Sequence, residues 1–331
     1  MPLTTISVLA LGGTIAAVPD ASGRNATMDL DADQIVRSIP AVAGVAEVRP
    51  ESFRRLGSAE LGLADVTALA ERIDELAATG IDGVVVTQGT DTLEETAFLL
   101  DRLVAADLPV VVTGAMRNAG LPGADGPANL LAAVRVAASP LAHGVGTLVV
   151  MNDEIHAARF VRKGHATSPA TFESPGIGRL GWVAEERVRI PLVPRSRSPR
   201  VTRPDAASSP DVALVKLSLD DSPRLLELIS AKDYAGAVIE VYGAGHTSRR
   251  ALDALGALAA RMPTVFASRT GVGEVHTSTC DFGGSELRLL ERGLIPAVAL
   301  DGLKSRLLLT LLLAAGTDRA GITAAFENAA E

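Results

Sequence analysis

The stretch VVVTQGTDTLEETAFLL, residues 84–100, decides how the chain is organised, because it joins an apolar strand pattern directly to an amphipathic helix pattern. Between the two patterns lie Thr90, Asp91 and Thr92. Thr92 with Glu95 three residues later predicts a capping box, which stabilises a helix start by about 1 kcal/mol. This structural role accounts for Thr92 and leaves Thr90 and Asp91 for another purpose.

The same alternation of short apolar runs and helical periodicity extends over the first 190 residues. Strands separated by helices imply parallel pairing, with the helices covering the sheet. We therefore expect an α/β fold. The expected strands are 5–11, 45–49, 83–87, 109–113 and 146–151, and the expected helices are 32–38, 64–78, 93–105 and 127–138.

The composition changes at PLVPRSRSPRVTRPDAASSP, residues 191–210. This segment is rich in Pro, Ser and Arg and shows no periodic pattern of apolar residues. We interpret this segment as a linker with solvated arginines rather than a phosphate-binding patch. It would join a larger N-terminal domain, 1–190, to a smaller α/β domain, 211–331. The strands expected there are 212–217, 236–241 and 263–267, and the helices are 222–231, 248–260, 285–292 and 302–314.

Composition excludes several classes of protein. Of 331 residues 47% are hydrophobic and 21% charged, and the formal net charge of −8 argues against a nucleic-acid partner. The single cysteine, Cys280, cannot form an intrachain disulfide. No apolar stretch reaches the ~18 residues of a membrane span, and no Lys or Arg precedes Arg24 to form the charged region of a secretory signal. A cytoplasmic protein is expected.

Three expected strands end in glycine-containing turns, GGTIA, QGTDT and TGAMR. Ligands of open parallel sheets bind beyond the carboxyl ends of the strands, and glycine lets a substrate approach the backbone. Thr14 and Thr90 each follow a glycine there, which suggests hydroxyls converging on a pocket. A phosphate loop is disfavoured because neither dinucleotide nor P-loop glycine spacing occurs. The polar segment 16–30 is interpreted as a lid.

These segments resemble a known family. LALGGTIAAV and VVVTQGTDTLEETAFLL are similar to the two signature segments of the bacterial-type L-asparaginase/glutaminase family. Further similarity covers LGSAELGLADVTALAERI, VVVTGAMRNAGLPGADGPANLLAAV, VVMNDEIHAARFVRKGHATSPATFES and GAVIEVYGAGHTS. The resemblance implies a doubly wound, flavodoxin-like, mostly parallel N-terminal sheet with a smaller C-terminal α/β domain. It also implies hydrolysis of L-asparagine, and possibly of L-glutamine, without a cofactor, by a homotetramer built from dimers.

By this resemblance Thr14 is the nucleophile, with Thr90, Asp91 and Lys163 as the other catalytic residues. The chemistry agrees, because a threonine hydroxyl needs a neighbouring base and a desolvated lysine can serve as one. The Asp91 carboxylate suits the substrate's α-ammonium group, and the Ser58 hydroxyl suits its α-carboxylate. The Thr90 N–H suits the oxyanion. The substrate-binding residues implied are Gly13, Ser58, Gly89, Asp91 and Ala115.

The sequence departs from the family pattern at three positions. The only tyrosines are Tyr234 and Tyr242, so the lid tyrosine is missing and the simplest alignment places Ala26 there. Asn25, Thr27 or water could take over its contact with Thr14. Gln88 replaces a histidine, and Ala59 replaces a glutamine. These changes leave two alternatives open, a related amidase with another amide substrate and an amino-acid-binding protein without catalysis.

The five histidines are His143, His156, His165, His246 and His276. They are scattered and show no H-E-x-x-H motif and no cysteine partners, so no metal site is expected. His246 lies in a loop that in this family approaches a neighbouring subunit's active site. Glu286 could be the family's intersubunit glutamate, or it could simply complement a helix dipole.

Overall fold

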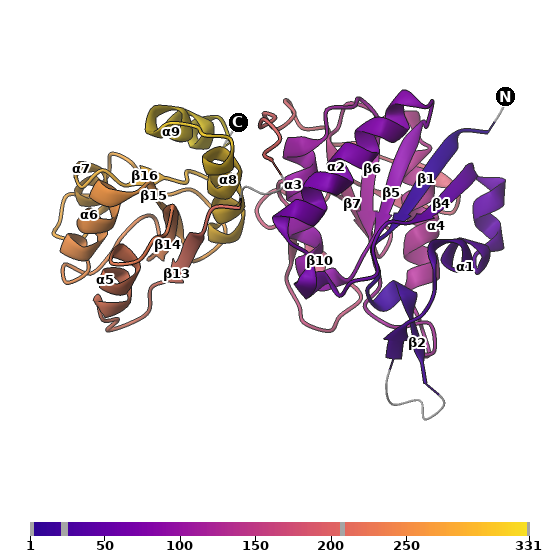
Figure 1. The fold of residues 1–331 in the computed structure, drawn as a ribbon, viewed down its shortest axis with the longest axis horizontal. Coiled ribbons are helices and arrows are strands. Elements are labelled where there is room, and N and C mark those ends of the chain that lie inside the picture. The colour runs from indigo at the N-terminus through magenta and orange to yellow at the C-terminus, as the bar shows by residue number, and fades with distance from the viewer. Residues whose placement is uncertain (1–2, 21–25, 206–208, 330–331) are drawn as a thin grey trace. The chain divides into compact units, whose positions relative to one another are not determined.

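The computed structural model describes residues 3–20, 26–205 and 209–329. It divides into two compact units, Met1–Arg200 and Val201–Glu331, and each is described by itself (Figure 1). The division falls inside the segment 191–210. Within the first unit, the carbonyl of Pro199 accepts a hydrogen bond from the buried Arg102 guanidinium at 3.1 Å, and Arg197 pairs with Asp107 at 2.9 Å. This end of the segment therefore packs on the first unit.

The first unit is built around one eight-stranded sheet in the order β12-β11-β8-β7-β6-β5-β1-β4. Five strands are parallel and, taken in chain order, lie in the sequence 2-1-3-4-5, which is the doubly wound, flavodoxin-like arrangement expected. The parallel strands are β1 (Thr5–Ala10), β4 (Glu47–Ser52), β5 (Gly83–Thr87), β6 (Val110–Thr113) and β7 (Thr147–Met151). The mostly parallel sheet is thereby confirmed.

Three antiparallel strands that the sequence analysis did not predict extend this sheet. They are β8 (Glu154–Ala157), β11 (Gly181–Ala184) and β12 (Arg187–Arg189). The connection from β7 to β8 is a two-residue turn, in which Asn152 and Asp153 both have positive φ (52° and 60°). Asn and Asp tolerate this conformation well, so the turn reverses the chain without a crossover helix.

Helices cover both faces of the sheet (Figure 1). α1 (Ala32–Arg37) and α4 (Gly126–Ala137) pack on the face that carries Ile6, Val8 and Val85. α2 (Leu63–Ala78) and α3 (Leu93–Leu103) pack against each other on the opposite face. α2 buries an i, i+3, i+4, i+7 stripe that includes Val66, Leu69 and Ile73, as its sequence periodicity predicts.

Short elements complete the first unit. Two antiparallel hairpins are β2 (Ala17–Pro19) with β3 (Ala26–Met28) and β9 (Arg162–Lys163) with β10 (Phe172–Glu173). Single 3₁₀ turns are η1 (Thr14–Ala16), η2 (Pro40–Gly44), η3 (Ser58–Glu60), η4 (Thr90–Thr92) and η5 (Pro140–Ala142). The β2–β3 hairpin occupies the segment interpreted as a lid.

The second unit contains a four-stranded parallel sheet, β13 (Val212–Lys216), β14 (Gly236–Val241), β15 (Thr264–Ser268) and β16 (Ile295–Pro296), in that order. Its helices are α5 (Arg224–Ser230), α6 (Leu252–Arg261), α7 (Glu286–Glu291), α8 (Gly302–Ala314) and α9 (Arg319–Asn328). The smaller C-terminal α/β domain is thereby confirmed. β16 and α9 were not predicted, because β16 has only two residues and α9 buries little beyond Ile322 and Phe326.

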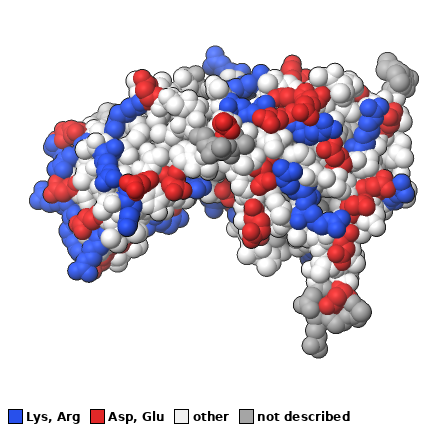
Figure 2. Space-filling view, in the orientation of Figure 1, with Lys and Arg blue, Asp and Glu red and all other residues white. Residues whose placement is uncertain are grey.

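Basic and acidic side chains are interspersed over the face shown in Figure 2. In the described part of the chain, every helix is too short or too polar to cross a bilayer.

Candidate active site

The expected site lies at the topological switch point of the first sheet, between the carboxyl ends of β1 and β5. From β1 the chain passes to β4 on one side, whereas β5 leads to β6 on the other, so the loops after β1 and β5 diverge. Such a divergence opens the crevice in which ligands of doubly wound sheets bind. Gly13 with Thr14 follows β1, and Gly89 with Thr90 follows β5.

The loops after β1, β4 and β5 meet through glycines. A Cβ atom on Gly13 would lie 2.1 Å from the Gly89 amide nitrogen, and one on Gly89 would lie 2.7 Å from Ser58 Oγ. Gly13 also has φ 81° and ψ −172°, a region that is essentially restricted to glycine. Gly89 thus lies against both Gly13 and Ser58, and the half-buried Thr14 and the buried Thr90 follow immediately after the two glycines.

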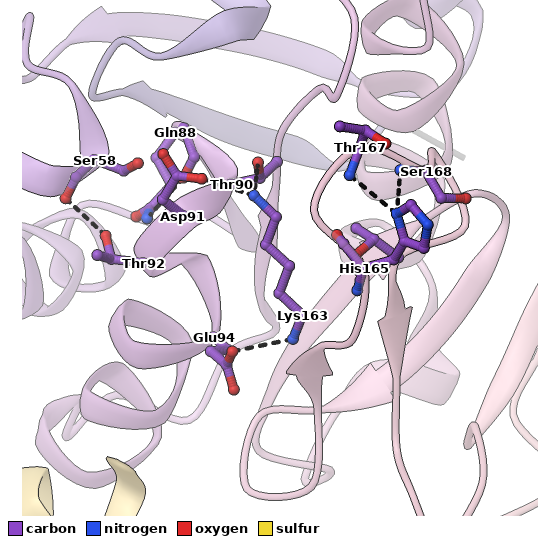
Figure 3. A network of polar contacts seen from close by, with 12 residues as sticks. Ser58, Gln88, Thr90, Asp91, Thr92, Glu94, Lys163, His165, Thr167 and Ser168 are labelled. Carbon is purple, nitrogen blue, oxygen red and sulfur yellow. Dashed lines mark hydrogen bonds and ion pairs between the residues drawn. The ribbon is translucent and has the colours of Figure 1, made fainter.

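Lys163 points its amine at the start of α3 (Figure 3). Its Nζ lies 3.0 Å from Thr90 Oγ1 and 2.7 Å from Asp91 Oδ1. The Lys163 side chain is 14% exposed, whereas that of Asp91 is 73% exposed. The structure therefore brings three of the four expected catalytic residues into direct contact, and it leaves the Asp91 carboxylate accessible to a substrate.

Glu94, which the sequence analysis did not single out, holds the main chain of Lys163. Its Oε1 accepts the Lys163 backbone N–H at 3.0 Å, and its side chain is buried in the first turn of α3 (Figure 3). Lys163 is consequently held at its backbone by Glu94 and at its amine by Thr90 and Asp91. An acidic residue in the first helical turn is common for dipole reasons alone, so the sequence carried no specific signal for this role.

Thr92 does not cap α3 with its side chain, so the predicted capping box is wrong. Its hydroxyl instead donates to the Ser58 carbonyl at 2.8 Å (Figure 3). The side chain of Thr92 is turned towards the Ser58 loop, so its oxygen does not accept an N–H group from the first turn of α3. The contact ties the Ser58 loop to the helix that begins beside Thr90.

Ala115, expected to bind substrate, is fully buried. Its loop is held by the Asp125 carboxylate, which accepts the N–H groups of Met116 at 2.9 Å and Arg117 at 2.8 Å. A Cβ atom on the neighbouring Gly114 would lie 3.4 Å from Thr90 Cγ2. The Ala115 loop therefore adjoins the Thr90 turn.

On the lid side, Met28 returns to the glycine turn, where its Sδ accepts the Gly13 N–H at 3.0 Å. Ala26, at the position expected for a tyrosine, pairs with Pro19 in the β2–β3 hairpin. The Thr27 hydroxyl donates to the Asp29 carboxylate. Asn25, the other expected substitute, lies outside the described residues. The contact of Met28 with Gly13 was not anticipated from the sequence.

Two residues near the site have buried polar groups. Gln88 is fully buried, and its Nε2 donates to the Gly89 carbonyl at 3.3 Å. His156 bonds to Ser174 Oγ at 2.9 Å through Nδ1. Burial lowers the pKa of His156 below its ordinary value, because a charged imidazolium would be poorly solvated there, although nearby Glu154 acts in the opposite direction.

Comparison with known proteins identifies the family. The asparaginase N-terminal domain model matches residues 5–194, and the glutaminase/asparaginase C-terminal domain model matches residues 211–326. The chain belongs to the asparaginase family. The family resemblance stated from the sequence is therefore confirmed.

Relatives named asparaginases match nearly the whole chain. L-asparaginase 2 of Bacillus subtilis is 34% identical over 98% of this chain and 87% of its own length. The probable L-asparaginase of Deinococcus radiodurans is 35% identical over 98% and 97%. A crystal structure of a probable cytoplasmic L-asparaginase from Campylobacter jejuni superposes with a TM-score of 0.88 at 31% identity, covering 98% of this chain and 99% of that one. L-asparaginases are amidohydrolases.

Proposed function

We propose that this asparaginase-family protein hydrolyses L-asparagine to L-aspartate and ammonia through an acyl-enzyme on Thr14. The observation that carries the proposal is the contact of Lys163 Nζ with Thr90 Oγ1 and Asp91 Oδ1 at the switch point of the sheet. It supplies an amine beside a hydroxyl, which is what activation of a threonine requires. No step of this reaction requires a cofactor or a metal.

In the proposed reaction, Thr14 Oγ1 attacks the side-chain amide carbon while its proton passes through the Thr90 hydroxyl to the Lys163 amine. The C–N bond then breaks, and the proton leaves with ammonia. Water attacks the resulting ester and releases aspartate, which regenerates Thr14. The N–H groups at the glycine turns would stabilise the oxyanion, Thr90 N–H first among them.

Substrate would be held at its two charged ends. The exposed Asp91 carboxylate meets the α-ammonium group, and Ser58 with the backbone of Gly13, Gly89 and Ala115 surrounds the rest. The close packing of Gly13, Gly89 and Ser58 supports this assignment, because it leaves backbone groups rather than side chains lining this end of the crevice.

Ammonia release from L-asparagine, measured with two variants, tests the proposal. Thr14→Ala should lower kcat by at least about 10⁴-fold, as removal of a nucleophile does elsewhere. Thr90→Val should lower it by about 10²–10⁴-fold, the range for general acid–base groups. Thr79→Val, which changes an exposed threonine at the end of α2, is the control and should leave kcat unchanged.

Rapid quenching followed by peptide mass spectrometry identifies which threonine carries the aspartyl group. An adduct on the peptide containing Thr14 supports the assignment. An adduct on Thr90, or unchanged turnover in both variants, contradicts it.

A related amidase with a different amide substrate is the second candidate. The small side chains of Ala26 and the exposed Ala59, where larger residues were expected, favour it because they leave more room around a substrate. One relative, from Pseudomonas fluorescens, is named glutaminase-asparaginase. Ranking kcat/KM over asparagine, glutamine and larger amides decides between the candidates. Calorimetric binding of aspartate without turnover of any amide would instead indicate a binding protein.

We also propose a cytoplasmic homotetramer made of two dimers, with the loops of His246 and Glu286 reaching a neighbouring subunit's site. The name of the Campylobacter jejuni structure supports the location, although a relative from Haemophilus influenzae is named periplasmic. Light scattering coupled to size exclusion tests the assembly, and a dimer or monomer at assay concentrations contradicts it.

A further inference from the structure

Three potential ligands of a metal ion converge in the second unit. His246 lies in the loop after β14, Cys280 precedes α7, and Glu286 is the first residue of α7. One ligand atom from each lies within 4.8 Å of the other two. Within residues 3–20, 26–205 and 209–329, these are the only three His, Cys, Asp or Glu side chains so arranged. This cluster was not predicted from the sequence, because Cys280 lies 34 residues from His246.

Glu286 turns one carboxylate oxygen into this cluster without a hydrogen-bond partner. Its side chain is fully buried, and Oε1 accepts the N–H groups of Thr279 at 2.9 Å and Cys280 at 2.5 Å. Oε2 makes no hydrogen bond to the described residues and lies 3.5 Å from His246 Nε2. A buried carboxylate oxygen without a hydrogen-bond partner is unfavourable, so a cation bound beside it would be stabilising.

The loops that present these side chains are held together closely. Tyr242 and His246 exchange two backbone hydrogen bonds of 2.8 Å, and Thr247 N–H donates to the Gly284 carbonyl at 2.7 Å. A Cβ atom on Gly284 would lie 2.1 Å from the Thr247 carbonyl oxygen. The His246 ring also packs edge-on against Phe282, with ring centres 5.0 Å apart. The backbone therefore fixes where the imidazole stands relative to the carboxylate.

We propose that His246 Nε2, Cys280 Sγ and Glu286 Oε2 bind a divalent transition-metal ion of the zinc class. Imidazole, thiolate and carboxylate are the ligands that zinc takes, at about 2.0–2.3 Å, whereas calcium and magnesium prefer oxygen ligands alone. Two ligands at about 2.0 Å in tetrahedral geometry lie about 3.3 Å apart, close to the 3.5 Å between Nε2 and Oε2. Binding releases the Cys280 thiol proton to solvent.

The fourth coordination position faces outwards. His246 is 30% exposed and Cys280 is half-buried, so the ion can enter from that side. Three protein ligands with one open position leave room for water or for a ligand from another molecule.

Cobalt(II) is the probe for the test, because a cobalt–thiolate bond gives a near-ultraviolet charge-transfer band and Cys280 is the chain's only thiol. The purified full-length protein should show this band, with one equivalent of zinc abolishing it by displacement. Cys280→Ser should lack the band, and His246→Ala should weaken cobalt binding at least about tenfold, as loss of a ligand does. His143→Ala, an exposed histidine of the first unit, is the matched control and should bind cobalt like the wild type.

Alkylation of Cys280 gives a second measurement. Zinc at ten times its Kd should slow alkylation by about 11-fold, because only the free fraction of thiol reacts. Absence of the band together with an unchanged alkylation rate would overturn the proposal, as would cobalt binding that persists in Cys280→Ser with wild-type affinity.

These measurements do not require turnover, even though the loops of His246 and Glu286 are proposed to reach a neighbouring subunit's site. Thr14→Ala protein should bind cobalt as the wild type does even if it lacks activity. Failure of the asparaginase assay and failure of the metal assay are therefore separate results.

Discussion

Replacing Gly13 by alanine should disable the site through the backbone alone. The added Cβ would lie 2.1 Å from the Gly89 amide nitrogen, whereas ordinary van der Waals contact begins at 3.4 Å. The difference requires the two turns to separate by about 1.3 Å. Gly89 backbone cannot yield as a flexible side chain would, so Thr14 and Thr90 must move apart as well.

The size of the effect follows from this displacement. A misplacement of about 1 Å lowers the rate of a positioned reaction by about 10²-fold, so kcat for ammonia release should fall by at least that factor. Overpacking contributes about 1–3 kcal/mol of destabilisation. The backbone conformation of Gly13, unfavourable for alanine, adds about 1–3 kcal/mol. The melting temperature should therefore fall together with kcat.

Gly44→Ala is the matched control for the same methyl group. Nothing lies within 4 Å of a Cβ atom there, so kcat should stay unchanged, and stability should rise by up to about 1 kcal/mol. Ammonia release and thermal unfolding are measured on both variants. Wild-type kcat and melting temperature in Gly13→Ala would show that the two turns are not in contact. The argument that their contact shapes the proposed pocket would then be refuted.

Two further variants address groups outside direct chemistry. Glu94→Ala removes the acceptor of the Lys163 N–H and should lower kcat by about 10–10²-fold with little change in KM. Glu94→Gln keeps an acceptor oxygen and should retain most activity. Equal rates in the two variants would refute the positioning role. Burial lowers the pKa of His156 below 6.5, its ordinary value. Below about pH 6.5 the unfolded chain therefore binds a proton at this residue that the folded chain does not bind. Acidification consequently lowers the free energy of unfolding. In His156→Gln, the melting temperature should fall less on acidification than in the wild type. His143→Gln, the control at an exposed site, should behave like the wild type. Identical slopes of melting temperature against pH in all three proteins would contradict the argument.

The parallel core could be predicted because its strands are buried on both faces and appear in the sequence as continuous apolar runs. Val84, Val85 and Val86 are all fully buried in β5, and the expected bounds of that strand, 83–87, agree with the structure. β11 and β12 could not be recognised in the same way. They are short, and Arg187 and Arg189 of β12 are exposed at the sheet edge, so no apolar run marks them.

The site was predictable only where a motif was contiguous. Thr90 and Asp91 can be recognised in the sequence directly after β5. Lys163 lies 73 residues from Thr90 and 72 from Asp91, and only the family resemblance connected it to them. Glu94 acts through the backbone N–H of a residue 69 positions away, and Asp125 acts through N–H groups of its own loop; no local motif encodes either contact. For Thr92 the local signal for a capping box was clear, but the prediction was wrong. Its hydroxyl bonds to the Ser58 carbonyl, a tertiary contact that the local sequence does not indicate.

The attachment of Lys163 at both ends to the beginning of α3 has a consequence for the work done in each turnover. A free lysine side chain carries about 2 kcal/mol of rotamer entropy, which a mobile base would lose again each time it lined up with its substrate. Here Glu94 secures the main chain, while Thr90 and Asp91 secure the amine, all within five consecutive residues. That ordering takes place once, when the polypeptide folds, and in the proposed mechanism every later catalytic cycle would begin with the amine already aligned.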